Sequence, residues 1–167
     1  GTERLYAISE DQHHNAAYYR NTAIHYFILD AFVEIALLDA AATDGDRSEA
    51  FFTRTSELRE LFKFEFYLPR SADYRSEIER RVSDRFDDWE KALEGGAAGV
   101  REAFDKMQLL VAHGVLRSFA DAYRVAAGVL AASEAEAVDS KSAFLSKCLK
   151  TGKQELLQGR VFSAESV

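Results

Sequence analysis

Residues 21–42 read NTAIHYFILDAFVEIALLDAAA, and this run decides the fold. Apolar side chains lie on both flanks of its few polar residues, so the run predicts a helix that is apolar almost all round. Such a helix is usually enclosed by other elements. We therefore expect a helix over about residues 10–42, covered by the core and, in a chain this small, by a partner surface as well.

The rest of the chain also favours helices, because it has a single proline, Pro69, and few alternating apolar runs. Residues 64–68 alternate and fit either the end of a helix or a short strand. Five helices with short links predict an all-α fold, one orthogonal or bundle-like domain over residues 1–167. The four further helices are expected at about residues 47–66, 72–84, 98–132 and 140–158, with glycine-rich residues 95–99 as a linker.

Length and charge bound the function. The chain has 167 residues, of which 47% are apolar and 12% aromatic, which is enough to fill one core. Its 28 acidic and 21 basic side chains leave a net charge of -7. An acidic balance repels phosphate backbones, so we expect no nucleic-acid partner, and it disfavours docking on anionic lipid through charge alone. The single cysteine, Cys148, excludes an internal disulfide and fits a reducing compartment.

His25 and Asp30 have the His-x-x-x-x-Asp spacing found in some acyltransferase active sites. On a continuous helix, five steps of about 100° turn the two side chains roughly 140° apart. A carboxylate that orients a catalytic imidazole must lie within hydrogen-bond reach of it. A continuous helix therefore predicts no catalytic pair, whereas a break between the two residues would allow one. We expect His25 to be hydrogen-bonded in or near the core.

Other candidate motifs point to structure rather than chemistry. Glu10 and His13 have the Glu-x-x-His spacing of di-iron bundles, but no second copy exists, so neither a metal nor a cofactor is expected. The mixed charges of residues 54–59 and 77–85 recur at helical spacing, which is typical of solvated faces. Tyr18, Tyr19, Arg20 and Asn21 form a dense set of hydrogen-bonding side chains. They suit an anchor in a core or interface, although Arg20 is also able to bind a carboxylate or phosphate.

Five blocks of the sequence, together, resemble the C-terminal region of membrane-bound glycerol-3-phosphate acyltransferases, in particular the long bacterial form. They occur in the family's order and cover nearly the whole chain. The blocks are AAYYRNTAIHYF (16–27), ELRELFKFEFYLP (57–69), FDDWEKAL (86–93), LLVAHGVLRSFADAYRVAAGVLA (109–131) and FLSKCLKTGKQELLQGRVFSAESV (144–167).

This resemblance implies a parent enzyme that moves an acyl group from acyl-CoA or acyl-carrier protein to the sn-1 hydroxyl of glycerol 3-phosphate, in phospholipid synthesis. In the family the catalytic His-x-x-x-x-Asp lies in a separate N-terminal acyltransferase domain, so no catalytic residue carries over to this chain. His25 and Asp30 have the spacing but lie in a block that is not the catalytic one. The chain is then expected to be most of a C-terminal domain, truncated near residue 167.

We therefore expect a non-catalytic domain that packs on the N-terminal acyltransferase domain of its parent and is inactive alone. The substrates and the membrane would be bound by the parent, at the cytoplasmic face of the plasma membrane. The alternative is an autonomous all-α module that binds a protein or an apolar ligand. A ligand-sized apolar pocket would favour ligand binding, and an exposed apolar patch near the first helix would favour docking. The residues predicted to contact the other domain are Tyr18, Tyr19, Arg20, Asn21 and His25.

Overall fold

The computed structural model describes residues 7–106, 112–132, 140–162 and 164–166. Regular structure in these ranges is helical throughout, which confirms the all-α prediction. The chain divides into two compact units, residues 1–115 and 116–167, and each is described here by itself. The eight described α-helices are α1 (His13–Ala23), α2 (Ile28–Ala41), α3 (Arg47–Phe62), α4 (Ser71–Arg85), α5 (Trp89–Glu94), α6 (Gly96–Asp105), α7 (Arg117–Ala131) and α8 (Lys141–Leu157). Four short 3-10 helices accompany them: η1 (Glu10–Gln12), η2 (Ile24–Tyr26), η3 (Ala112–Leu116) and η4 (Ala164–Ser166).

The helix expected over residues 10–42 is not continuous. It begins as η1 and α1, tightens into η2 and restarts as α2 after Phe27, whose amide donates to the Ile24 carbonyl over 2.9 Å. The break falls in the run Ile24 to Phe27, where β-branched and aromatic side chains lose rotamer freedom in a helix. Just before it, the Thr22 hydroxyl bonds back to the Tyr19 carbonyl, a contact that bends helices.

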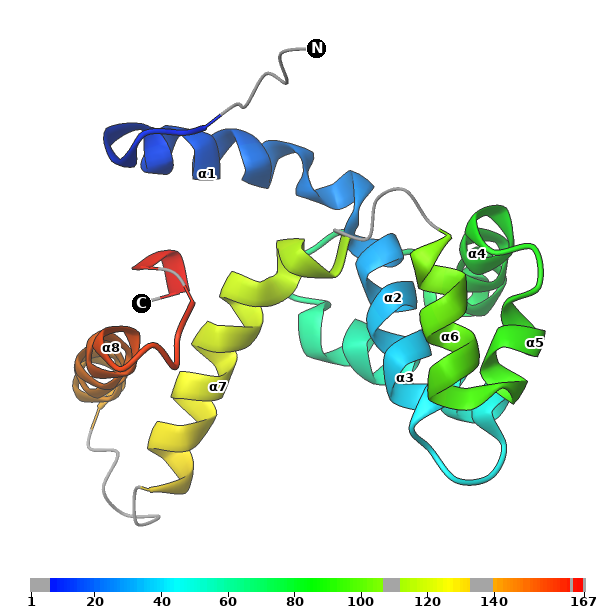
Figure 1. The fold of residues 1–167 in the computed structure, drawn as a ribbon. Helices are drawn as coiled ribbons and strands as arrows, with labels where there is room; N and C mark the ends of the chain where they lie inside the picture. Colours follow the sequence, from blue (N-terminus) through cyan, green and yellow to red (C-terminus); the bar gives the residue numbers. More distant parts are fainter. Residues whose placement is uncertain (1–6, 107–111, 133–139, 163, 167) are drawn as a thin grey trace. The chain divides into compact units, whose positions relative to one another are not determined.

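Helix α2 lies at the centre of the first unit and contacts α3, α4, α5 and α6 (Figure 1). Ten of its fourteen residues are buried. Phe32 lies against Phe62 with ring centroids 6.0 Å apart. The enclosure expected for this apolar run is therefore confirmed, and helices of the same unit provide it.

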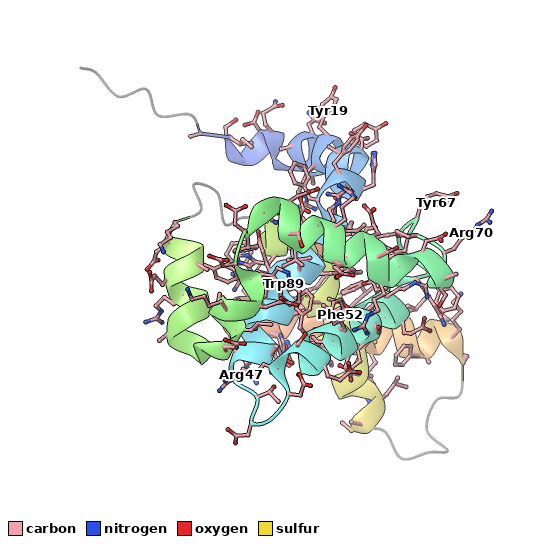
Figure 2. All side chains as sticks on the ribbon, turned by 90° about the vertical axis from the view of Figure 1, so that its right-hand side faces the viewer. Tyr19, Arg47, Phe52, Tyr67, Arg70 and Trp89 are labelled. Atoms are coloured by element: carbon pink, nitrogen blue, oxygen red, sulfur yellow. The ribbon has the colours of Figure 1, made fainter. Side chains whose placement is uncertain are left out.

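A second aromatic group joins α3 to α5. The ring centroid of Trp89 lies 5.1 Å from that of Phe51 and 5.9 Å from that of Phe52 (Figure 2). Aromatic pairs at such distances stabilise beyond the area they bury. Together with α2, these rings hold the beginning of α3 and α5 in one core.

Helix α3 ends at Phe62, four residues earlier than expected, and residues 63–65 form a turn. Residues 64–68 are thus neither the end of a helix nor a strand. Phe64 and Tyr67 are exposed and so do not form the buried face of a strand. The next helix follows prediction closely, because α4 buries Tyr74, Ile78 and Val82 along one face.

The glycines at 95–99 form a tight corner between α5 and α6 and not the expected linker. Gly96 has a φ of +62°, a conformation that glycine adopts without steric cost. A Cβ on Gly99 would lie 2.4 Å from the Ala92 carbonyl oxygen, so only glycine allows the two helices to approach this closely. Arg47 secures the corner by donating from Nη1 to the Glu94 carbonyl over 3.1 Å.

The second unit is built on α7 and α8. Val125, Val129 and Val161 are buried. Helix α8 begins as predicted, where the Ser140 hydroxyl accepts from the Ala143 amide over 3.1 Å, and it is followed by Gly159 with a φ of +68°. The helix expected over residues 98–132, with a possible break at His113 and Gly114, is divided into α6, η3 and α7, and η3 contains both of these residues. Residues 107–111 lie outside the described residues.

Candidate functional site

A partly buried cluster of polar side chains joins three elements of the first unit. We name it the polar cluster: Asp30 and Glu34 on α2, Arg81 and Arg85 on α4, and His113 on η3. Glu34 is completely buried. The two carboxylates are four residues apart on one helix and the two arginines four residues apart on the other, so each pair lies on one face. This spacing lets the two helices bring both charged pairs together.

Each carboxylate of the polar cluster has a close basic partner. Arg81 donates from Nη1 to Asp30 Oδ1 over 3.0 Å, and Arg85 donates from Nη2 to Glu34 Oε1 over 2.8 Å. The second Glu34 oxygen accepts from the His113 backbone amide over 2.8 Å and lies 2.8 Å from the His113 ring Nδ1. A buried carboxylate loses its hydration, and hydrogen-bonding and basic partners such as these must compensate for that loss. The arrangement explains how a glutamate is tolerated in the core.

The polar cluster also bears on whether His25 and Asp30 form a catalytic pair. The helix does break between them, as a catalytic pair would need, but Asp30 is held by Arg81 on α4. His25 is exposed, with its ring centroid 4.0 Å from that of Tyr26. The expectation that His25 is hydrogen-bonded near the core is wrong, because η2 places the side chain outside the core formed by α2 to α6. The two residues do not form a catalytic pair in this geometry.

The residues predicted to contact another domain lie on α1 and η2. Tyr18 and Tyr19 are 67% and 71% exposed, with their rings in an edge-to-face contact. Tyr19 is labelled in Figure 2. Asn21 and His25 are exposed, and Arg20 is half-buried with its guanidinium donating to Asn21 Oδ1 over 3.0 and 3.2 Å.

Two further aromatic residues, Tyr26 and Phe27, are exposed beside these positions. We name residues 18–27 the aromatic segment. Exposed aromatic side chains of this kind are enriched in interaction surfaces. The position of these side chains is compatible with docking, although the contact itself remains a prediction.

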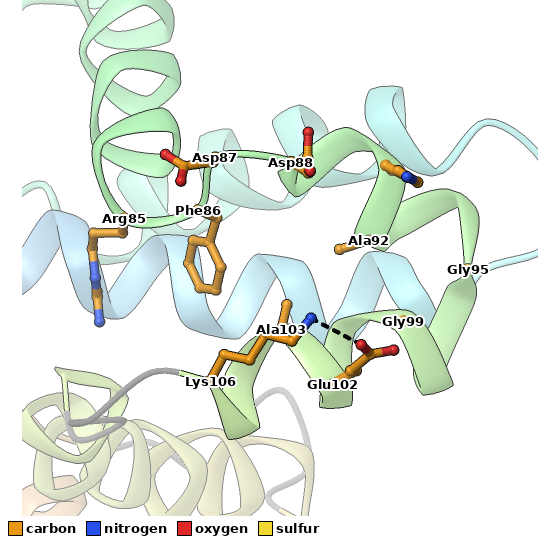
Figure 3. A pocket seen from close by; sticks show the side chains of 11 residues that line it. Arg85, Phe86, Asp87, Asp88, Ala92, Gly95, Gly99, Glu102, Ala103 and Lys106 are labelled. Atoms are coloured by element: carbon orange, nitrogen blue, oxygen red, sulfur yellow. Dashed lines mark hydrogen bonds and ion pairs between the residues drawn. The ribbon is translucent and has the colours of Figure 1, made fainter.

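A pocket of about 580 Å³ lies beside the corner of α5 and α6 (Figure 3). Its wall includes three basic side chains, Arg85, Lys91 and Lys106, and three acidic ones. Lys106 donates to Glu102 over 2.8 Å, and this hydrogen bond lowers the pKa of Glu102 and raises that of Lys106. Balanced charges give no net attraction for an ion, and the charged wall does not suit an apolar ligand.

Metal ligands do not gather in the described ranges. No group of three or more histidine, cysteine, aspartate or glutamate side chains lies close enough there to hold an ion. The side chains of Glu10 and His13, the pair with di-iron spacing, lie outside the described residues. None of the helices in the described part of the chain combines the length and the apolar character needed to cross a membrane.

Sequence reasoning missed the polar cluster. Residues 77–85 were expected to form a solvated face, but Arg81 and Arg85 are half-buried and pair with α2. The signal was present in the spacing, because Arg81 and Arg85 each lie three residues after a buried apolar residue, Ile78 and Val82. They therefore border the buried face of α4. His113 carries no comparable signal, since 79 residues separate it from Glu34.

Comparisons with known proteins match the whole chain to one protein family. A family model described as the C-terminal region of glycerol-3-phosphate acyltransferase matches residues 1–167. The chain is 41% identical over 169 aligned residues to plsB1 of Mycobacterium bovis and of two Mycobacterium tuberculosis strains, a protein whose name assigns it provisionally as an acyltransferase. These alignments cover 99% of this chain and 27% of each relative, so the chain spans about a quarter of their length. No solved structure matches the chain.

Proposed function

The chain belongs to the family of glycerol-3-phosphate acyltransferase C-terminal regions, and from this premise we propose that it is a non-catalytic helical part of a larger acyltransferase. The observation that carries the proposal is the family match over every residue of the chain. The parent would transfer an acyl group from acyl-CoA or acyl-carrier protein to the sn-1 hydroxyl of glycerol 3-phosphate. It would do so at the cytoplasmic face of the plasma membrane, with its catalytic residues in an N-terminal domain.

The polar cluster supports a structural role for the charged residues of this chain. A general base must have a lone pair within reach of the substrate proton. Glu34 is buried with basic or amide donors at both oxygens, and Asp30 is held by Arg81. These carboxylates therefore connect helices. Acyl transfer would then be catalysed by another part of the parent.

The aromatic segment is the surface that we propose docks on the N-terminal domain. Exposed tyrosines supply large contact area with little conformational entropy to lose, and they are enriched in interfaces. Tyr18, Tyr19, Asn21 and His25 are exposed together on α1 and η2, and Arg20 is held against Asn21 beside them. Packing of these residues on the catalytic domain would cover apolar surface that is now in contact with solvent.

Activity measurements test the catalytic part of this proposal. The purified 167-residue chain, supplied with glycerol 3-phosphate and acyl-CoA or acyl-carrier protein, is expected to form no lysophosphatidate, whereas the full parent forms it. Far-UV circular dichroism should show that the chain is helical in the same buffer. Acylation by the chain alone would overturn the assignment of the chemistry to another domain.

Binding measurements test the docking part. The chain and the remainder of its parent are expressed separately and mixed, and their association is followed by size-exclusion chromatography. The double variant Tyr18→Ala/Tyr19→Ala is expected to weaken association by tenfold or more, since truncation of buried interface tyrosines commonly costs above about 1 kcal/mol each. The matched control is Tyr67→Ala, because Tyr67 is fully exposed in the same unit but lies outside the aromatic segment. Equal association of the three proteins would show that docking uses another surface.

The alternative, an autonomous module for a protein or an apolar ligand, has weaker support. Exposure of the aromatic segment favours docking, while the pocket at the α5–α6 corner has a charged wall that suits an apolar ligand poorly. The alternative would be favoured if a fatty acid bound the isolated chain and if substitutions of residues lining this pocket abolished that binding.

A further inference from the structure

Helix α8 differs in charge from the rest of the chain. Between Lys141 and Arg160 the sequence holds five basic side chains and one acidic side chain, a local net charge of +4 in a chain whose total is -7. The single acidic residue, Glu155, is mostly buried, and its Oε2 forms an ion pair with Arg124 Nη2 of α7 at 2.8 Å. The exposed surface of α8 is therefore basic. Its exposed lysines are Lys141, Lys147, Lys150 and Lys153.

Leucines share this surface with the lysines. Leu145 and Leu149 are 48% and 49% exposed, and Leu157 is 89% exposed. The exposed Leu149, Lys150, Lys153 and Leu157 are related by steps of three, four or seven residues, so they lie on one face of the helix. The nearly opposite side of α8 carries the half-buried Phe144, Cys148 and Glu155, and Glu155 forms an ion pair with Arg124 of α7. Helix α8 thus keeps one face for its own unit and presents a ridge of leucine and lysine outside it. We name Leu149, Lys150, Lys153 and Leu157 the α8 ridge.

We propose that the α8 ridge docks on an anionic lipid surface. The leucines would enter the boundary between headgroups and acyl chains, while the lysine stems lie along the surface and their ammonium groups reach lipid phosphates. Lysines near an anionic membrane each contribute to attraction, and exposed leucines add the apolar term that charge alone lacks. With 17 residues and several lysines, α8 is suited to lie on a membrane and not to cross it.

A lipid surface fits this ridge better than a protein surface does. Protein interfaces are depleted in lysine, because its long side chain and strong hydration make burial costly. At a bilayer the same side chain keeps its charged end in the polar headgroup layer. The rest of the chain carries a net negative charge, which the same membrane would repel. Only the basic face of α8 is therefore suited to bind that membrane.

Vesicle binding tests the proposal directly. The 167-residue chain is sedimented with vesicles of phosphatidylcholine containing phosphatidylglycerol, and with vesicles of phosphatidylcholine alone. We expect clear binding to the anionic vesicles, little to the neutral ones, and weakening as salt is raised. The double variant Lys150→Gln/Lys153→Gln is expected to bind about thirtyfold more weakly, since each lysine near the surface is worth about fivefold. Leu149→Ser is expected to weaken binding without changing its dependence on salt.

A matched control separates local from overall charge. Lys63→Gln/Lys106→Gln removes the same two charges from exposed positions in the first unit, where each lysine pairs with a glutamate. It should bind anionic vesicles almost as the unaltered chain does. Equal losses in the two double variants, or no binding to anionic vesicles, would overturn the proposal.

A second experiment distinguishes lipid from protein as the partner. In the full parent, lysine acetylation is followed by mass spectrometry with and without anionic vesicles. Protection of Lys150 and Lys153 only when vesicles are present supports the proposal. Protection in their absence would show that protein covers the ridge and would overturn it. This inference rests on α8 alone, so failure of the aromatic segment to dock would leave it standing, and the reverse also holds.

Discussion

Helices α2 and α8 have similar lengths but opposite environments. Ten of the fourteen residues of α2 are buried, including the charged Glu34, whereas Gly152 is the one buried residue among the seventeen of α8. Four helices contact α2, and in the described part of its unit α8 packs mainly on α7. The apolar side chains of α2 therefore stabilise the fold, whereas those of α8 remain able to contact another surface.

The comparison separates two uses of hydrophobic residues. In α2 they are removed from water by the chain's own helices, and each contributes to the free energy of folding. In α8 the leucines of the ridge remain exposed, so the chain gains little from them until another surface covers them. Substitutions in the two helices should therefore differ in size and in the property that they change.

The largest effect is expected for Phe32→Ala in α2. The Phe32 side chain is completely buried and lies against Phe62, so its removal leaves a cavity that costs about 3–5 kcal/mol of unfolding free energy. Urea unfolding followed by fluorescence of Trp89, the only tryptophan, measures this unit. Tyr67→Ala is the control and should change the value by less than about 0.5 kcal/mol, because the side chain is fully exposed. A loss below about 1 kcal/mol for Phe32→Ala would contradict the central position of α2.

Two glycines give the next comparison. Gly99→Ala should destabilise the first unit by about 1–3 kcal/mol, because the new Cβ would lie 2.4 Å from the Ala92 carbonyl oxygen and push α5 from α6. Gly128→Ala in α7 should instead raise helix stability by about 0.5–1 kcal/mol, since nothing lies within 4 Å of the added Cβ. Thermal unfolding by circular dichroism measures both variants. Equal effects of the same sign would show that the α5–α6 corner is not closely packed.

A smaller loss is expected for Tyr74→Phe. The Tyr74 hydroxyl donates to the Thr55 carbonyl over 2.7 Å and joins α4 to α3, while burial raises the pKa of this phenol above its ordinary value. Removal of one buried hydrogen bond should cost about 1 kcal/mol in urea unfolding. Tyr18→Phe, on the exposed aromatic segment, is the matched change and should leave the unfolding free energy unaltered.

The smallest effect concerns Glu77, whose hydrogen bond to Arg80 lowers the pKa of its carboxyl below the ordinary 4.5. A lowered pKa stabilises the folded state above the unfolded value, and this contribution is lost as pH falls through the folded pKa. Glu77→Gln should therefore reduce the unfolding free energy by less than about 1 kcal/mol at pH 7. The difference should shrink as the pH falls below about 4.5. A difference that stays constant across this pH range would contradict the ion-pair explanation.

Much of the first unit is readable from the sequence. The run at 21–42 predicts an enclosed helix because apolar residues lie on both flanks of its few polar ones, and α2 is the enclosed part of it. Tyr74, Ile78 and Val82 follow helical spacing within the helix expected over residues 72–84 and form the buried face of α4, and the helix expected over residues 140–158 agrees with α8. These features are local, since they depend on residues within one or two turns of each other.

The remaining features depend on residues that are distant in the sequence. A glycine-rich segment is typical of a linker, and only the nearness of Ala92 to Gly99 shows that it is a packed corner. Asp30 looks like a partner for His25 in sequence, yet Arg81 holds it from 51 residues away. In sequence, Tyr18 and Tyr19 suit an anchor in either a core or an interface, and only the structure shows that both are exposed.

By itself the sequence determined the helical class, the buried run at the centre of the first unit and, through its family blocks, a place in an acyltransferase. Hydrophobic period, caps and glycines act over short distances, so they can be read without a structure. Only the tertiary structure decided which charged residues pair across helices, which helices enclose α2 and which leucines stay exposed. Those properties depend on which surfaces exclude water, and that is settled when helices far apart in the sequence pack on one another.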